Sequence, residues 1–66
     1  MKPQDIHKGM KVVATDLPDA TVYTVEAINK YIVELRYITP SGQVVDAGVL
    51  DACFLNIPTN EQLANA

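Results

Sequence analysis

The stretch TVYTVEAINKYIVELRYI, residues 21–38, decides the fold class of this chain. It contains no proline or glycine, and some of its apolar residues have helical spacing: Val25, Ile28, Ile32 and Leu35. However, eleven of its eighteen residues are β-branched or tyrosine, and such side chains suit a pleated strand better than a helix. We therefore predict two strands here, at about residues 21–29 and 31–38.

Alternation in the second half of this stretch assigns its two faces. One face is apolar or aromatic at every second residue: Tyr31, Val33, Leu35 and Tyr37. The opposite face combines charged and apolar side chains: Ile32, Glu34, Arg36 and Ile38. Asn29 and Lys30 lie between the two strands and predict a tight hairpin, since asparagine tolerates a positive φ.

The segments on either side predict two further strands. Residues 9–14 alternate and form the first strand, and Pro18 between two aspartates predicts the turn-bearing loop that follows it. Residues 39–42, TPSG, have proline second and glycine fourth, as a type I hairpin turn prefers. The fourth strand is predicted at residues 43–47.

A fifth strand is expected at residues 53–57, after a 3₁₀ turn within residues 48–52. Alternation places Cys53, Leu55 and Ile57 on its inner face and Phe54 on its outer face.

The C-terminal residues are expected to follow the domain rather than belong to it. Pro58 ends the last strand, so residues 1–58 form one domain. Thr59 and Gln62 have the spacing of a capping box, which predicts a short helix or tail over residues 59–66.

The order of these strands resembles that of the Src-homology-3-like small barrels. The resemblance covers Gly9 to Ile57 and rests on Gly9 and Val12 at the start, the hairpin turn at 39–42 and the turn at 48–52. It implies an all-β fold, a small five-stranded Src-homology-3-like barrel with a 3₁₀ turn before the last strand. Fold alone says little about function, because such barrels serve many functions.

Three kinds of such barrel can be compared with the chain. Peptide-binding Src-homology domains use a groove of aromatic residues that includes tryptophan, and this chain has no Trp. KOW-type domains have glycines in the loop after the first strand, whereas residues 15–21 have none. Plasmid-type dihydrofolate reductases have a Val-Gln-Ile-Tyr pore strand, which residues 43–46 do not reproduce. No catalytic residue is carried over from any of them.

Composition restricts the partners. The formal net charge is −3 and the pI is near 4.7, which argues against nucleic acid and anionic lipid as partners. No apolar run has the length of a membrane span or a signal peptide, so a cytoplasmic protein is expected. A domain this short buries only about 60% of its unfolded surface, which favours association with itself or with another protein.

The sequence indicates no catalytic residue, no cofactor and no metal. His7 is the only histidine and has no partner nearby in the sequence. Cys53 is the only cysteine, has no adjacent cation, and is expected in the core. Asp46 and Asp51 flank a bend and form a possible polar site, although aspartates at such places also cap turns.

The outward-pointing apolar residues are the candidate interface: Val13, Ile32, Ile38 and Phe54. They favour a non-catalytic module for protein binding or self-assembly. Two alternatives stay open. One is an enzyme or small-ligand binder whose site lies between subunits and uses Asp46, Asp51, Tyr23 or His7. The other is a nucleic-acid accessory domain that uses the basic residues near the N-terminus, Lys2, Lys8 and Lys11.

Overall fold

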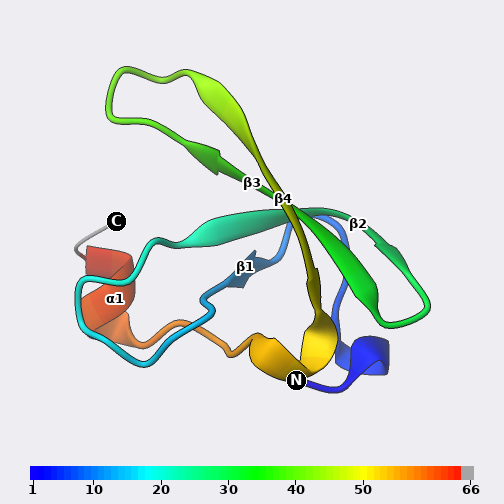
Figure 1. The fold of residues 1–66 in the computed structure, drawn as a ribbon. Helices are drawn as coiled ribbons and strands as arrows, with labels where there is room; N and C mark the ends of the chain where they lie inside the picture. Colours follow the sequence, from blue (N-terminus) through cyan, green and yellow to red (C-terminus); the bar gives the residue numbers. More distant parts are fainter. Residues whose placement is uncertain (65–66) are drawn as a thin grey trace.

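The computed structural model describes residues 1–64 and consists mainly of one antiparallel sheet (Figure 1). Its elements, in chain order, are η1 (Pro3–Asp5), β1 (Lys11–Val12), β2 (Tyr23–Asn29), β3 (Ile32–Ile38), β4 (Val44–Asp51), η2 (Ala52–Phe54) and α1 (Asn60–Ala64). The stretch 21–38 forms strands and not a helix: it contains the β2–β3 hairpin, although residues 21, 22 and 31 of the predicted strands lie outside β2 and β3.

The predicted five-stranded barrel is wrong. The sheet has four strands in the order β1-β2-β3-β4, and it is open. The segment predicted as the fifth strand, residues 53–57, instead begins within η2 and then makes one isolated bridge, between Val13 and Asn56. The physical reason lies at Asp51, whose side chain accepts the backbone N–H of Cys53 at 3.0 Å and caps a 3₁₀ turn there.

This turn replaces strand alternation with a different burial pattern. Leu55 is fully buried, as predicted, but Cys53 and Ile57 are exposed, so their assignment to an inner face is wrong. Ile57 keeps 68% of its surface accessible. The 3₁₀ turn itself was predicted within residues 48–52, and it begins where that range ends, at Ala52.

Both hairpins have a positive φ where the chain turns. Between β2 and β3 the positive φ falls on Lys30, at 58°, and not on Asn29. Between β3 and β4 the N–H of Gly42 donates to Thr39 O at 2.8 Å, which confirms a turn at residues 39–42. Gly42 has φ +88°, a conformation that glycine adopts without steric cost.

β4 is longer than predicted because a bulge carries it past the expected bend. The pairing with β3 shifts between Leu35 and Arg36, so two residues of β4, Ala47 and Gly48, occupy the space of one. Gly48 has φ +89°, and its N–H donates to the Asp46 carboxylate at 3.0 Å. The glycine therefore marks a bulge inside the strand, not the end of the strand.

The core lies on the inner face of the curved sheet. It is a cluster of seven buried residues, Ile6, Val12, Val25, Val33, Leu35, Ala52 and Leu55. The Met1 ammonium group donates to Ala52 O at 3.0 Å and Leu55 O at 2.7 Å, so the start of the chain is held against η2.

The C-terminal helix forms as its capping box predicts. The N–H of Gln62 donates to Thr59 Oγ1 at 3.1 Å, and the N–H of Thr59 donates to Gln62 Oε1 at 2.8 Å. The amide nitrogen of Gln62 also donates to Thr15 O at 3.0 Å and Leu17 O at 2.9 Å. These bonds attach α1 to the loop after β1, and the Gln62 side chain that makes them is buried. The predicted continuation through residues 65–66 lies outside the described residues.

Candidate functional site

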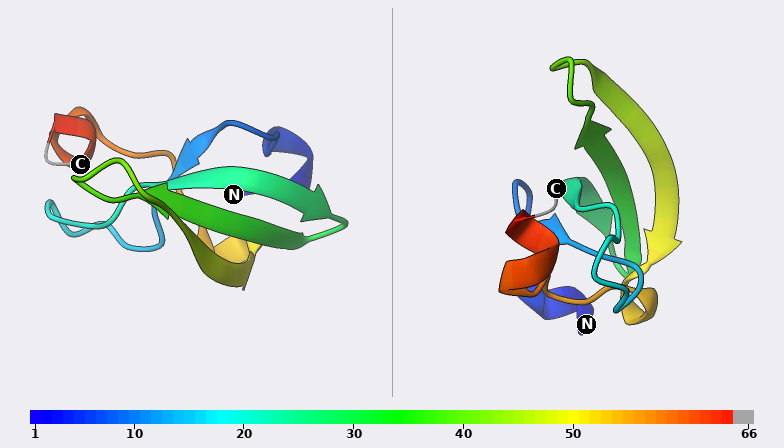
Figure 2. Two further views of the ribbon diagram at one scale, coloured as in Figure 1. Left: turned by 90° about the horizontal axis from the view of Figure 1, so that it is seen from above. Right: turned by 90° about the vertical axis from the view of Figure 1, so that its left-hand side faces the viewer.

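β4 forms an edge of the sheet. β4 pairs with β3 on one side, and no strand within residues 1–64 pairs with the other side. In the right-hand view of Figure 2, β4 is the outermost strand, with no other segment beyond it. An exposed edge of this kind presents backbone donors and acceptors to another chain.

Hydrogen-bond alternation identifies the backbone groups that face this open edge. Thr39 N donates to Gln43 O at one end of the β3–β4 pair, and Ala52 N donates to Tyr31 O at the other. Since bonding alternates along an antiparallel pair, the N–H and C=O groups of four β4 residues point away from β3. These residues are Val44, Asp46, Val49 and Asp51.

The side chains of the same four residues share one face of the sheet, which we call the outer face. They are paired with the outward residues of β3, Ile38, Arg36, Glu34 and Ile32 in that order. The bulge preserves this arrangement on both sides of Ala47. Val44, Val49 and Ile38 each keep 58% of their surface accessible. The edge therefore combines open backbone groups with exposed apolar side chains.

The charges beside this edge are mostly negative. β4 contains Asp46 and Asp51 and no basic residue. Arg36 lies opposite Asp46 in the register, but its Nη1 pairs with Glu26 Oε2 at 2.6 Å. That Glu26 oxygen is buried and has no hydrogen-bond partner within residues 1–64, so the guanidinium charge compensates it. Asp46 has no ion pair among the described residues, and its acceptor atom Oδ1 is used by Gly48 N–H.

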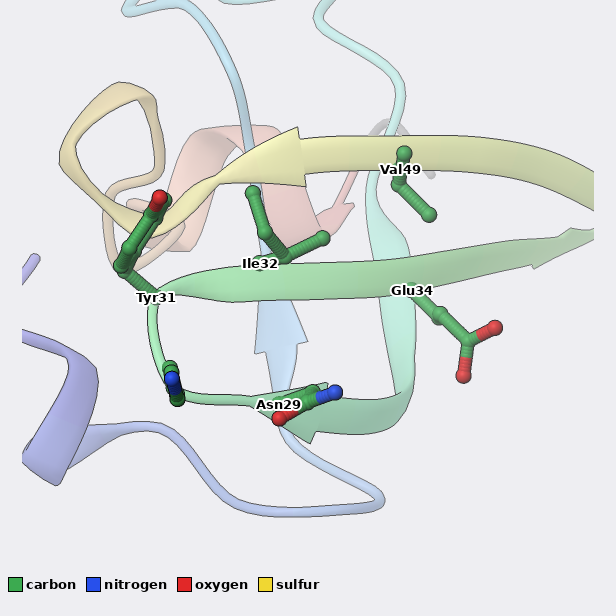
Figure 3. A pocket seen from close by; sticks show the side chains of 6 residues that line it. Asn29, Tyr31, Ile32, Glu34 and Val49 are labelled. Atoms are coloured by element: carbon green, nitrogen blue, oxygen red, sulfur yellow. The ribbon is translucent and has the colours of Figure 1, made fainter.

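A pocket of about 430 Å³ lies at the β2–β3 hairpin and reaches β4 at Val49. Its lining consists of Asn29, Lys30, Tyr31, Ile32, Glu34 and Val49. Figure 3 shows Val49 on β4 across from Glu34 on β3, with Ile32 two residues further along β3 toward Tyr31. Of the lining residues, Val49 comes from β4, so the pocket adjoins the edge strand from the β3 side.

The predicted interface residues are separated in the structure. Ile32 and Ile38 lie on the outer face, but six residues of β3 place them about 20 Å apart. Phe54 is 61% exposed and belongs to η2, outside the sheet. Val13 is buried, with 1% of its surface accessible, so it cannot belong to an exposed patch.

The burial of Val13 has a structural cause. The Val13–Asn56 bridge and the attachment of α1 at Thr15 and Leu17 bring the end of the chain back to β1. The residues that follow β1 are therefore held against the C-terminal segment.

The possible polar site has a structural role at both of its residues. Asp46 accepts the N–H of Gly48 and Asp51 accepts the N–H of Cys53, each at 3.0 Å. His7 is exposed, and Tyr23 packs edge-to-face on Tyr37 with ring centroids 6.2 Å apart. Within residues 1–64, no three histidine, cysteine or carboxylate side chains converge on a metal site.

Asp51 raises the pKa of the Cys53 thiol. A hydrogen bond to the Asp51 carboxylate, some desolvation and the nearby negative charge together raise the pKa of the Cys53 thiol. Exposure alone does not make this thiol reactive, because the thiolate is the nucleophile.

We expect Asp51→Asn to lower the pKa of Cys53 and to shift the alkylation rate curve to lower pH. The asparagine oxygen can still accept the Cys53 N–H, so η2 is retained. The measurement is the rate of iodoacetamide labelling of the folded protein between pH 7 and 10. Asp46→Asn is the matched control and should leave the curve in place. Identical curves for wild type and Asp51→Asn would show that the carboxylate does not control the thiol.

The chain matches no known family, and neither a curated protein nor a solved structure is significantly similar to it. The resemblance to Src-homology-3-like proteins stays a prediction from the strand pattern. No helix in the described part of the chain has the length and apolar character needed to cross a membrane.

Sequence reasoning missed two residues of the edge, Val44 and Val49. The predicted fourth strand ended at Ala47 because Gly48 suggested a bend. The apolar-acidic alternation resumes one residue late, with Val49 and Asp51 continuing the pattern of Val44 and Asp46. This one-residue shift around a glycine is the signature of a bulge.

Proposed function

We propose that this protein is a non-catalytic protein-binding module that takes up an extended segment of another polypeptide along the open edge of β4. One observation carries this proposal. At four residues of β4, the backbone N–H and C=O groups point to the open edge, and the side chains lie together on the outer face. Addition of a strand to a sheet edge uses these features: main-chain hydrogen bonds supply affinity, and alternate side chains supply specificity.

The size of the edge supports the proposal. β4 spans eight residues, so an added strand can form main-chain bonds at Val44, Asp46, Val49 and Asp51. The pocket lined by Ile32 and Val49 lies on the same face as the side chains of this edge. By contrast, the carboxylates considered for catalysis are occupied by backbone N–H groups.

Amide hydrogen exchange tests the proposal directly. The probe is the neutral peptide acetyl-STVTSTVT-amide, added at millimolar concentration. In the protein alone, the amides of Val44, Asp46 and Val49 should exchange fast, while those of Val45 and Leu50, directed at β3, should be protected. Bound peptide should slow exchange at the first three by at least about tenfold, because each gains a hydrogen bond.

Two variants of one residue provide the matched comparison. Val49→Pro removes an outward N–H, a position where an edge strand tolerates proline, and should abolish the peptide effect. Val49→Thr keeps the N–H and the β-branched shape and should retain the effect. The spectrum of each free variant reports whether the β3–β4 pair is intact. The proposal fails if the peptide leaves all β4 amides unchanged or protects them equally in Val49→Pro.

A further inference from the structure

We infer that the strand bound at β4 is basic. Its side chains on the same side of the sheet as the outer face are lysine or arginine alternating with valine or isoleucine. This inference rests on the proposed function and adds the chemistry of the partner. It follows from charge complementarity along the edge and from the spacing that the bulge imposes.

The row of side chains beside the added strand alternates in character. It consists of Val44, Asp46, Val49 and Asp51. Because of the bulge, the two-residue step from Glu34 to Arg36 in β3 spans the same length as the three-residue step from Val49 to Asp46 in β4. A regular strand on the open side, like β3, therefore meets the four residues at every second position. Its matching pattern is basic, apolar, basic, apolar at positions 1, 3, 5 and 7.

The negative charges at this edge have little compensation within the protein. Arg36 is paired with Glu26, and no ion pair of Asp46, Asp51 or Glu34 is found among the described residues. Lys30 lies at the hairpin end of the pocket, beyond Ile32, and not along β4. Opposite charges facing each other across a strand pair are favourable, and like charges are unfavourable. A basic strand thus satisfies the edge that the fold leaves acidic.

The same argument disfavours a second copy of the chain at this edge. A second copy could pair its β4 antiparallel to this β4, with the four outward residues of each strand opposite one another. Val44 then lies beside Asp51 of the other molecule, and Asp46 lies beside its Val49. Two further aspartates then lie diagonally next to each Asp46, with no basic residue in either β4 strand. Charged residues on an exposed edge are a known protection against such pairing.

Four peptides of eight residues test the inference by fluorescence titration at low salt. The basic peptide is KTVTKTVT, the neutral one STVTSTVT and the acidic one ETVTETVT. The fourth, TKVTTKVT, has the composition of the basic peptide but places lysine and valine on opposite faces of a strand. We expect the basic peptide to bind about five- to tenfold more tightly than the neutral one, and the acidic peptide more weakly. The rearranged peptide should lose most of this gain.

Salt and a pair of variants separate local pairing from general attraction. Raising the salt to 0.5 M should remove most of the preference for the basic peptide. Asp46→Asn, which keeps an acceptor for Gly48 N–H, should reduce that preference by about threefold. Asp16→Asn, in an exposed loop, removes the same charge and should leave the preference unchanged.

The outcomes distinguish this inference from the proposed function. Equal binding of the basic, neutral and acidic peptides, with β4 amides protected, would overturn the basic partner and keep strand addition. Equal effects of Asp46→Asn and Asp16→Asn would assign the preference to net charge and overturn pairing at the edge. Failure of every peptide to protect β4 amides would overturn the proposed function itself. Dimerisation of the protein alone through the same amides would identify a second copy as the occupant.

Discussion

Replacement of Leu55 by alanine should lower the free energy of unfolding by about 3 kcal/mol. Leu55 has no accessible surface and belongs to the core cluster with Val12, Val25 and Leu35. Leu55 also lies between η2 and the Val13–Asn56 bridge, so the cavity cannot easily be filled by movement of that segment. A domain of this length has a total stability of roughly 3–10 kcal/mol, and the loss is therefore a large fraction of it.

Ile57→Ala is the matched control, because a strand at residues 53–57 would put Ile57 on the same face as Leu55. In the structure Ile57 is 68% exposed, and its truncation should change stability by no more than about 0.5 kcal/mol. Urea unfolding followed by circular dichroism gives both values. Should Leu55→Ala be unfolded in water, Leu55→Val should still show a loss of about 1 kcal/mol. Similar losses at Leu55 and Ile57 would instead indicate a regular strand.

The local chemistry of the chain predicted β2, β3 and the hairpin between them, because alternation and β-branched content act over neighbouring residues. The turn at 39–42 and the capping box of Thr59 and Gln62 were predictable for the same reason. The face assignment of Ile32 and Ile38 follows from the same alternation, and both are exposed as expected.

Long-range arrangement was harder to predict. Asp51 fits a strand end as well as a 3₁₀ cap, and only the burial of Ala52 and Leu55 decides between them. The burial of Val13 depends on residues more than forty positions away, at Asn56 and Gln62. Closure of a barrel likewise depends on whether the last segment pairs along its whole length, and here it pairs at one bridge.

The candidate site was only partly predictable for a related reason. Exposed apolar residues on β3 were found from alternation, but an open sheet edge is a property of the complete strand order. The open edge arises because β4 extends through Gly48 to Asp51 and has no partner strand on its other side within residues 1–64. The apolar residues of the site therefore come from β3 and β4 together, and not from β1 or η2.

The buried amide of Gln62 should contribute as much to stability as a large core residue. Gln62→Leu retains the size of the side chain but removes the donor to Thr15 O and Leu17 O and the acceptor for Thr59 N–H. These three backbone groups then lose their partner, and each such loss in a buried place costs about 1–3 kcal/mol unless water reaches it. We expect a total loss of about 2–3 kcal/mol in urea unfolding, with faster amide exchange in α1.

Gln62→Glu gives a pH-dependent version of the same test. Its ionised carboxylate can still accept the Thr59 N–H but faces the Thr15 and Leu17 carbonyls without a proton to donate. The folded state therefore favours the protonated carboxyl and raises its pKa above the unfolded value. Stability should be highest below the unfolded pKa and should fall as the pH rises through the raised one.

Glu61→Gln, at the exposed neighbouring position, should show neither effect. A Gln62→Glu variant whose difference in stability from wild type does not change between pH 4 and 7 would contradict the assigned donor role. Such a result would mean that α1 is held by packing alone. If the Gln62 amide holds α1 instead, this one side chain joins α1 to the loop after β1. Both segments should then loosen together when its donor group is lost.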